Sequence, residues 1–259
     1  MDFIRAVDWD LAEVDPPGGY KGQYLYSGES CFIIATKVPP GSGGPTRHLH
    51  SSDQSYFVLE GEITISLGPD ELRVPTGSAI FIPAGLPHQN WNRGDVDEVH
   101  LEVIAPGISP IEPILQATEE IGDAVHRGFL AASDPIRRGG DEFLQDWVVD
   151  RARGADHAGI YFAEVPPHKA GPPLHVHEFD QFYFVLSGVL SVEIGLSRMD
   201  VGPNNLIVLP AQVPHRQWNE QDEVEHHLTI LAPEPLIPHS VEHPWDVAVA
   251  LSQTGERID

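Results

Sequence analysis

The sequence predicts an all-β protein built from two tandem copies of one antiparallel domain. Glycine and proline each occur 24 times in 259 residues, which indicates many tight turns between short strands. The segments between those turns alternate polar and apolar residues, as half-buried strands do. The stretch from His48 to Gly61 returns as His175 to Gly188, 127 positions later and without a gap. A repeat of this length predicts two domains of ordinary size, each with its own core.

The charge of the chain argues against nucleic acid and membranes as partners. Asp and Glu total 39 against 15 Lys and Arg, a net charge of −24 that repels phosphates and anionic lipid faces. No apolar run approaches the roughly eighteen residues of a membrane span, and residues 1–5 lack the pattern of a secretory signal. The single cysteine, Cys31, lies among apolar residues and predicts a buried, unreactive thiol. We therefore expect a cytoplasmic protein in a reducing compartment.

The first copy divides into short strands in chain order. Residues 31–38 form a β-rich run that two prolines close, and alternation over residues 62–68 predicts a strand in a hairpin with the strand before it. Residues 77–83 form a strand that ends at a proline, after which a turn brings the chain back to His88. Residues 100–106 form the last strand, so the copy is a run of antiparallel strands.

The segments outside the copies have a different pattern. Residues 111–130 carry apolar side chains at helical spacing, and a further short helix is compatible with residues 247–251. Aromatic residues before Cys31 indicate edge strands that cover the first domain. The sequence thus predicts a first barrel over 1–110, a partly helical linker over 111–155, a second barrel over 156–235 and a tail over 236–259.

Two sets of three histidines are the candidate metal ligands. Residues two apart in a strand face the same side, so the two histidines of each His-X-His triplet point together. A third histidine follows each triplet after a proline-rich turn. Three neutral imidazoles that converge in a barrel suit iron, manganese, nickel, copper or zinc, so we expect one divalent ion per copy. The sets are His48, His50 and His88 in the first copy and His175, His177 and His215 in the second.

These motifs resemble the two signatures of the cupin superfamily, and the duplication resembles a bicupin, in particular the quercetinase-type and pirin-like metal-dependent dioxygenases. The resemblance covers residues 33–106 and 160–233. It implies two small antiparallel jelly-roll barrels, each with one divalent ion inside. It is far less specific for the reaction, because similar proteins include dioxygenases, decarboxylases, isomerases, storage proteins and ligand sensors.

The sequence departs from the family pattern at a few positions. Gln54 and Gln181 stand where the first motif carries an acid. The second motif is complete in the first copy, with Gly77, Pro83, Gly85, His88 and Asn92, whereas the second copy has Asn204 and Gln212 in place of the glycines. Asparagine tolerates a left-handed backbone, so Asn204 is a mild departure.

Four side chains beside the histidines are candidate catalytic residues. Gln54 and Gln181 either bind the ion through the amide oxygen or only hydrogen-bond nearby, and their identical replacement in both copies favours a role at the metal. Tyr56 and Tyr183 share their strand parity, so they point inward as core aromatics or as donors to a substrate oxygen. Side chains of the opposite parity, Asp53, Asp180, Trp91 and Trp218, should point away from the ion. The duplicated His100 and His227 are possible neighbours of the site.

The function that these features indicate is a metal-dependent dioxygenase. We expect Fe(II) to bind an enol, phenol or flavonol-like molecule through its oxygen, together with dioxygen. A decarboxylase or isomerase is the alternative, weakened because the glutamines remove the carboxylic acid that such proton transfer uses. A non-catalytic small-molecule-binding cupin is the third possibility. Because barrels expose sheet edges, we also expect a homo-oligomer.

Overall fold

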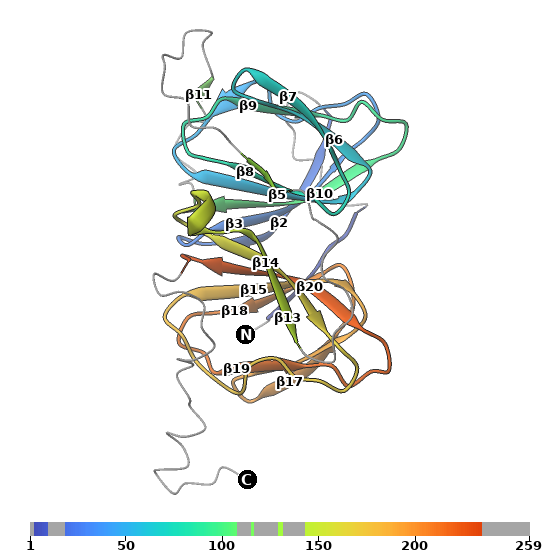
Figure 1. Cartoon of the computed structure of the whole chain (residues 1–259), viewed down its shortest axis with the longest axis vertical. Coiled ribbons are helices and arrows are strands. Elements are labelled where there is room, and N and C mark those ends of the chain that lie inside the picture. The colour runs from blue at the N-terminus through green and yellow to red at the C-terminus, as the bar shows by residue number, and fades with distance from the viewer. Residues whose placement is uncertain (1–2, 10–18, 108–114, 117–128, 132–142, 235–259) are drawn as a thin grey trace, which may run out of the picture. The chain divides into compact units, whose positions relative to one another are not determined.

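The computed structural model describes residues 3–9, 19–107, 115–116, 129–131 and 143–234 (Figure 1). These residues are almost entirely strands and turns, with one short 3-10 helix, η1 (Arg151–Arg153). No helix among them is long and apolar enough to cross a membrane. The chain divides into two compact units. We call residues 7–134 and 148–159 the first barrel, and residues 1–6, 135–147 and 160–259 the second barrel.

The first barrel has two antiparallel sheets. The six-stranded sheet has the order β12-β8-β5-β10-β3-β2, and the five-stranded sheet has the order β11-β4-β9-β6-β7. The strands of the first sheet are β2 (Lys21–Ser27), β3 (Phe32–Val38), β5 (Asp53–Glu60), β8 (Ala79–Ile82), β10 (Glu98–Ala105) and β12 (Phe129–Ala131). Those of the second are β4 (His48–Leu49), β6 (Glu62–Leu67), β7 (Asp70–Pro75), β9 (His88–Trp91) and β11 (Leu115–Gln116).

The second barrel repeats this plan. Its six-stranded sheet has the order β1-β18-β15-β20-β14-β13, and its three-stranded sheet has the order β17-β16-β19. The first of these contains β1 (Ile4–Ala6), β13 (Leu144–Val149), β14 (Gly159–Val165), β15 (Asp180–Ser187), β18 (Asn205–Leu209) and β20 (Glu225–Ala232). The other contains β16 (Leu190–Ile194), β17 (Ser197–Val201) and β19 (His215–Trp218). The all-β architecture with two repeated barrels confirms the predicted fold class.

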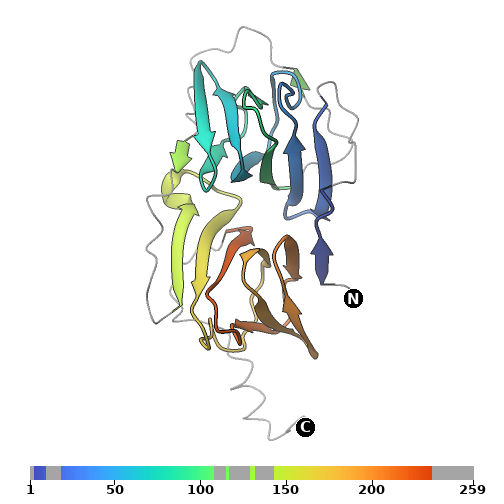
Figure 2. The same ribbon diagram turned by 90° about the vertical axis from the view of Figure 1, so that its right-hand side faces the viewer.

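Each barrel has its own apolar core between its two sheets. Figure 2 shows the strands from a direction at right angles to that of Figure 1. The first core joins side chains of β5 and β8 to side chains of β6 and β7, and the second joins β14, β15 and β18 to β16 and β17. Fully buried positions recur at the repeat offset, for example Ile63 and Leu190, or Ile80 and Ile207. Alternating apolar residues therefore face the same interior in both copies.

Strands from outside the repeated segments extend the six-stranded sheet of each barrel, and the sequence does not predict which sheet each of them joins. Ile4–Ala6 pairs with β18, so the chain begins in the second barrel, and β12 pairs with β8 of the first. β13, which lies in the predicted linker, is an edge strand beside β14. The predicted boundaries are 1–110, 111–155 and 156–235. The two units differ from them because residues 1–6 group with the second barrel, and because the linker is divided between the two barrels.

The predicted helix over residues 111–130 is wrong for those of its residues that the structure describes. Leu115–Gln116 pairs with β4, and Phe129–Ala131 pairs with β8, because open sheet edges offer backbone partners that outweigh a weak helical periodicity. The rest of that segment lies outside the described residues, as do residues 235–259 with the second expected helix.

Two tight turns near the third histidine need a left-handed backbone in both barrels. Gly77 and Gly85 have φ of 82° and 78°, and the residues that replace them, Asn204 and Gln212, have φ of 59° and 65°. The backbone N–H of Gly85 donates to His50 O at 2.8 Å, and that of Gln212 donates to His177 O at the same distance. The turn is thus tied to the His-X-His triplet whichever residue occupies it.

Candidate metal centre and its pocket

The three histidines of each copy converge in the structure. In the first barrel, His48 and His88 are paired across β4 and β9, and the ring centroids of the set lie 4.4–5.9 Å apart. In the second barrel, His175 and His215 form the equivalent bridge, and the centroids lie 4.5–5.7 Å apart. Within each set the candidate ligand atoms lie within 4.8 Å of one another. The structure therefore brings together both sets that the sequence predicts.

The backbone fixes which nitrogen of each ring faces the site. Nδ1 of His48, His50 and His88 lies 2.7–2.9 Å from a carbonyl oxygen of a nearby residue, and the three rings of the second set have the same contact at 2.7–2.9 Å. Nδ1 then carries the proton that is donated to the carbonyl, and Nε2 keeps a lone pair. This is the arrangement in which imidazoles bind metal ions.

Burial favours the neutral form of five of these six rings, those other than His50. It lowers the pKa of His88 and of His215 to about 3, assisted by the neighbouring histidines, and it lowers the pKa of His48 and of His175 as well. The Nε2 atom of His88 is also buried without a hydrogen-bond partner among the described residues. An unpartnered lone pair inside a barrel is costly unless a cation meets it, so these donors fit a divalent metal ion.

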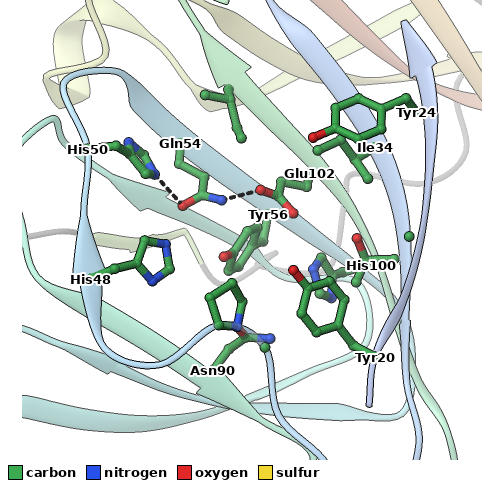
Figure 3. Close-up of a pocket in the computed structure, with 15 residues that line it drawn as sticks. Tyr20, Tyr24, Ile34, His48, His50, Gln54, Tyr56, Asn90, His100 and Glu102 are labelled. Atoms are coloured by element: carbon green, nitrogen blue, oxygen red, sulfur yellow. Dashed lines mark hydrogen bonds between the residues drawn. The ribbon is translucent and has the colours of Figure 1, made fainter. Parts of the chain in front are cut away.

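Gln54 adds a further acceptor to the first site. Its Oε1 lies 3.0 Å from Nε2 of His50, while its Nε2 donates to Oε1 of Glu102 (Figure 3). Turning the amide over would place its oxygen against the Glu102 carboxylate, so Glu102 holds the amide oxygen toward His50. Two lone pairs then face one another, an arrangement that a cation between them would stabilise. Binding of the ion by Gln54 stays a prediction.

Gln181 has different partners in the second site. Its Oε1 lies 2.7 Å from Nε2 of His177 and 3.2 Å from Nε2 of His215. Its Nε2 donates to the Tyr183 hydroxyl at 3.2 Å, and that hydroxyl donates to Oε1 of Gln217 at 2.8 Å. In the second site, the hydrogen bonds of Gln181 and Tyr183 therefore lead only to uncharged side chains among the described residues.

A cavity of about 110 Å³ opens beside the first histidine set. In Figure 3, His48 and His50 lie at one end, Tyr20 and Tyr24 at the other, and Gln54, Tyr56 and Glu102 between them. Apolar side chains complete its wall, among them Ile34 and Ile104. The cavity thus connects the candidate metal ligands His48 and His50 with polar groups from β2, β3, β5, β9 and β10.

Glu102 is the site residue that sequence reasoning missed. It lies on β10, where it pairs with Tyr56 of β5, and its side chain reaches the cavity beside Gln54. Burial raises the pKa of its carboxyl group, although His100 and Gln54 oppose the shift. The signal in the sequence was a difference between copies, because Thr229 occupies the equivalent position.

Bulky aromatic side chains occupy several of the equivalent positions in the second barrel. Tyr161 stands where the first barrel has Ile34, and Trp147 stands where it has Tyr20, with their rings 4.8 Å apart. Phe179, which corresponds to Ser52, stacks on His177 at 3.9 Å with an interplanar angle of 5°. The second barrel therefore has larger aromatic side chains at these three positions, and one of them stacks on a histidine of its set.

Tyr56 and Tyr183 lie inward, as their parity predicts. Both are almost fully buried, and burial raises the pKa of each hydroxyl well above its ordinary value, so each stays protonated. Tyr56 lines the cavity and also belongs to the apolar core. A catalytic role for either tyrosine stays a prediction.

The residues of opposite parity stabilise the scaffold. Asp53 Oδ1 accepts from the backbone N–H of Ala84 at 2.9 Å, and Asp180 accepts from Ala211 at 3.0 Å, so each acid holds the turn that leads to the third histidine. Trp91 and Trp218 are half-buried and lie under arginines, Arg93 over Trp91 at 5.2 Å and Arg198 over Trp218 at 4.8 Å.

His100 and His227 each form a buried pair with a glutamate two residues earlier. Nδ1 of His100 is 3.0 Å from both oxygens of Glu98, and Nδ1 of His227 is 2.8 Å from Glu225. Burial lowers the pKa of His100, but the Glu98 carboxylate outweighs it and the net shift is upward. Only His100 lies on a described cavity, where its ring packs 4.6 Å from that of Tyr56.

Comparison with known proteins agrees with this geometry. The chain is 31% identical over 72 residues to the uncharacterized protein MJ1618 of Methanocaldococcus jannaschii, a match that covers 28% of this chain and 58% of that protein. Among solved structures, Bacillus subtilis oxalate decarboxylase, whose Mn(II) centres have been studied, aligns with a TM-score of 0.68 at 12% identity, over 100% of this chain and 85% of that one. Escherichia coli YlbA aligns with a TM-score of 0.68 at 10% identity, over 90% and 92%.

Such low identities show the fold alone, but the family match covers more than half of the chain. Residues 35–104 and residues 161–231 each match the family described as Cupin domain. These two ranges contain all six histidines of the two metal-binding sets. The protein therefore belongs to the cupin family and carries two cupin domains in tandem.

Proposed function

We propose that the protein is a metal-dependent enzyme whose active site lies in the first barrel and whose substrate is a small molecule bound through an oxygen atom. The observation that carries the proposal is the combination of three buried, converging imidazoles with an adjoining cavity that is also lined by a carboxyl group. Metal site, cavity and ionisable group together are the usual components of an active site.

His48, His50 and His88 would hold the ion, and the ion would supply a positive charge that stabilises an anionic oxygen of the substrate. The remaining work falls to the protein. Gln54 adds an acceptor without adding negative charge, and the Tyr56 hydroxyl is a protonated donor on the cavity wall. The apolar wall excludes water, which strengthens these polar interactions.

Within this proposal we favour a dioxygenase that uses Fe(II), dioxygen and an enol or phenol. The uncharged Gln54 in place of the usual acid supports it, because the ion keeps its full positive charge for an enolate or phenolate. The size of the cavity sharpens the substrate class. At about 110 Å³ it is smaller than the roughly 150 Å³ cavity that holds benzene. A compact enol therefore fits better than a flavonol enclosed whole.

A decarboxylase or isomerase is the second candidate, and Glu102 is the observation that favours it. The sequence argument against this class rested on the loss of a carboxylic acid at position 54. In the structure, a carboxyl group from β10 lies in contact with the side chain of Gln54 instead. Burial raises the pKa of this carboxyl, which moves it toward the range in which a carboxyl group can donate or accept a proton.

Oxygen uptake separates these reactions. Protein purified without oxygen would first be assayed for bound metals, then loaded with Fe(II) or Mn(II) and offered small enols, diketones, dihydroxyaromatics and flavonols. A dioxygenase should consume one dioxygen per substrate, place both oxygen atoms in the product and be silent under argon. Equal turnover under argon would instead support the decarboxylase or isomerase. Substrate binding without turnover by any metal form would support a binding protein and overturn the enzyme proposal.

The remaining expectations are part of the same proposal. We propose a homo-oligomer, which light scattering at micromolar concentration would test, and a cytoplasmic location, which fractionation would test.

A further inference from the structure

We propose that Glu102 selects the substrate of the first barrel: it accepts a hydrogen bond from a hydroxyl or amino group at the end of the molecule opposite its metal-bound oxygen, and it rejects a second anionic group there. This inference rests on the proposed use of the first barrel as the active site. It predicts a small acid or enol that carries a hydrogen-bond donor, and it excludes dianions such as dicarboxylates.

The position of Glu102 supports this role. A chain of contacts runs from the His50 ring through the Gln54 amide to the Glu102 carboxylate, so the carboxylate lies one side chain away from the metal-binding nitrogens (Figure 3). β10 and β5 are adjacent central strands of the six-stranded sheet, which makes this spacing rigid. A molecule in the cavity can therefore contact the ion at one end and Glu102 at the other.

The hydrogen bonding of Glu102 leaves capacity for a ligand. Among the described residues, the carboxylate receives one side-chain hydrogen bond, from Gln54, on one of its two oxygens. A carboxylate accepts several hydrogen bonds, and a partly buried one that lacks them carries a desolvation cost. A donor from the ligand would offset that cost, whereas a second carboxylate would add like-charge repulsion at low dielectric.

The second barrel has the same three histidines but no carboxyl group at the position of Glu102. Thr229 replaces Glu102, and Gln181 donates to the Tyr183 hydroxyl instead of a carboxylate. The metal-binding histidines are nevertheless the same in both barrels. Glu102 is thus dispensable for the metal site itself, which leaves the cavity as the place where it acts.

The test uses four acids of similar size with the full-length protein loaded with Mn(II). The acids share one carboxylate for the ion and differ at the other end: β-alanine carries an ammonium group, 3-hydroxypropionate a hydroxyl, butyrate a methyl and malonate a carboxylate. Calorimetry measures their affinities, and metal analysis after each titration confirms that malonate has not removed the ion. We expect β-alanine and 3-hydroxypropionate each to bind at least about ten times more tightly than butyrate. Malonate should bind most weakly of the four.

Substitution of Glu102 should change this order. Glu102→Gln should remove most of the preference for β-alanine and strengthen malonate by about tenfold, because the negative charge is gone. Glu102→Asp keeps the charge and should keep the rejection of malonate, which guards against a Glu102→Gln protein that folds poorly. The matched control, Thr229→Val in the second barrel, should leave the order unchanged. An identical order in the wild-type and Glu102→Gln proteins would overturn the inference.

The outcome is independent of turnover. If the order follows Glu102 but no substrate is converted, the enzyme proposal fails while the recognition role holds. If turnover is found but the order ignores Glu102, the reverse conclusion applies.

Discussion

Glu102 in the first barrel and Thr229 in the second occupy the same position of the repeat. Several side chains at other equivalent positions also differ between the barrels. The first barrel surrounds that position with tyrosines and a cavity, whereas in the second barrel Trp147 packs on Tyr161 and Phe179 stacks on His177. The histidines, their carbonyl partners and the acids that hold the adjoining turns are the same in both. The candidate metal ligands are therefore identical in the two barrels. The side chains that a substrate would contact differ between them.

This comparison favours different roles for the two barrels. A duplicated site that retains its three histidines but has an aromatic ring stacked on one of them keeps the capacity to bind an ion and to stabilise the barrel. The first barrel has a preformed cavity with polar groups beside its histidines, as small-molecule sites usually do. We therefore propose, as part of the proposed function, that turnover takes place in the first barrel and that an ion in the second barrel has a structural role.

The largest expected effect comes from removing one histidine pair at a time. His48→Ala with His50→Ala should remove one of two bound ions and lower turnover by about a hundredfold or more, because the substrate loses its anchor. His175→Ala with His177→Ala should also remove one ion but retain most of the turnover. Elemental analysis and steady-state rates on the same samples measure both effects. Equal losses of turnover, or loss of both ions from either variant, would show that the barrels do not act independently.

An intermediate effect is expected from replacing each glutamine by the acid that is usual in the family. Gln54→Glu places a second carboxylate against Glu102, whereas Gln181→Glu places one beside the Tyr183 hydroxyl, which can donate to it. The free energy of unfolding of the metal-free protein should fall by about 1–3 kcal/mol in Gln54→Glu and by clearly less in Gln181→Glu.

Chemical denaturation at two pH values tests this contrast. Burial raises the pKa of Glu102, so one carboxyl of the new pair should protonate as the pH falls and then donate to the other. The destabilisation of Gln54→Glu relative to wild type should therefore shrink from pH 7.5 to about pH 5. A loss that grows with acidity, or one equal in both variants, would contradict the role given to Glu102.

The sequence predicts the convergence of the three histidines because its determinants are local. Strand parity brings His48 and His50 together, and a Pro-Gly turn at Gly85 returns His88 to them. Parity also places Gln54 and Tyr56 inward and Asp53 toward the turn backbone. In each case neighbours along one strand or one turn carry the information.

The features that the sequence did not predict depend on pairing between distant strands. Glu102 reaches the site because β10 pairs with β5, and no motif records that register. The three residues of β1 join β18, some two hundred positions away, through backbone hydrogen bonds that almost any residues could make. Comparing the copies position by position would have revealed Glu102, since Thr229 breaks the repeat there.

The smallest expected effect concerns the turn before the third histidine, where Gly85 of the first barrel corresponds to Gln212 of the second. Gly85 and Gln212 both have a left-handed backbone, with φ of 78° and 65°, and both donate the same hydrogen bond to the His-X-His triplet. A side chain in this conformation costs about 1–2 kcal/mol, partly offset because glycine gains entropy in the unfolded chain. The Gln212 side chain is exposed, and a Cβ at Gly85 would meet no atom within 4 Å, so packing contributes little at either turn.

Gln212→Gly should therefore stabilise the metal-free second barrel by about 0.5–1 kcal/mol, and Gly85→Ala should destabilise the first by a similar amount. Urea unfolding followed by tryptophan fluorescence measures both changes, with Ala211→Gly as a control for glycine entropy alone. That control should destabilise the protein, because its backbone is not in the left-handed region. If Gln212→Gly destabilised the protein as much as Ala211→Gly, the strain at position 212 would have to be compensated by a contact of the glutamine side chain, and the two turns would no longer be equivalent.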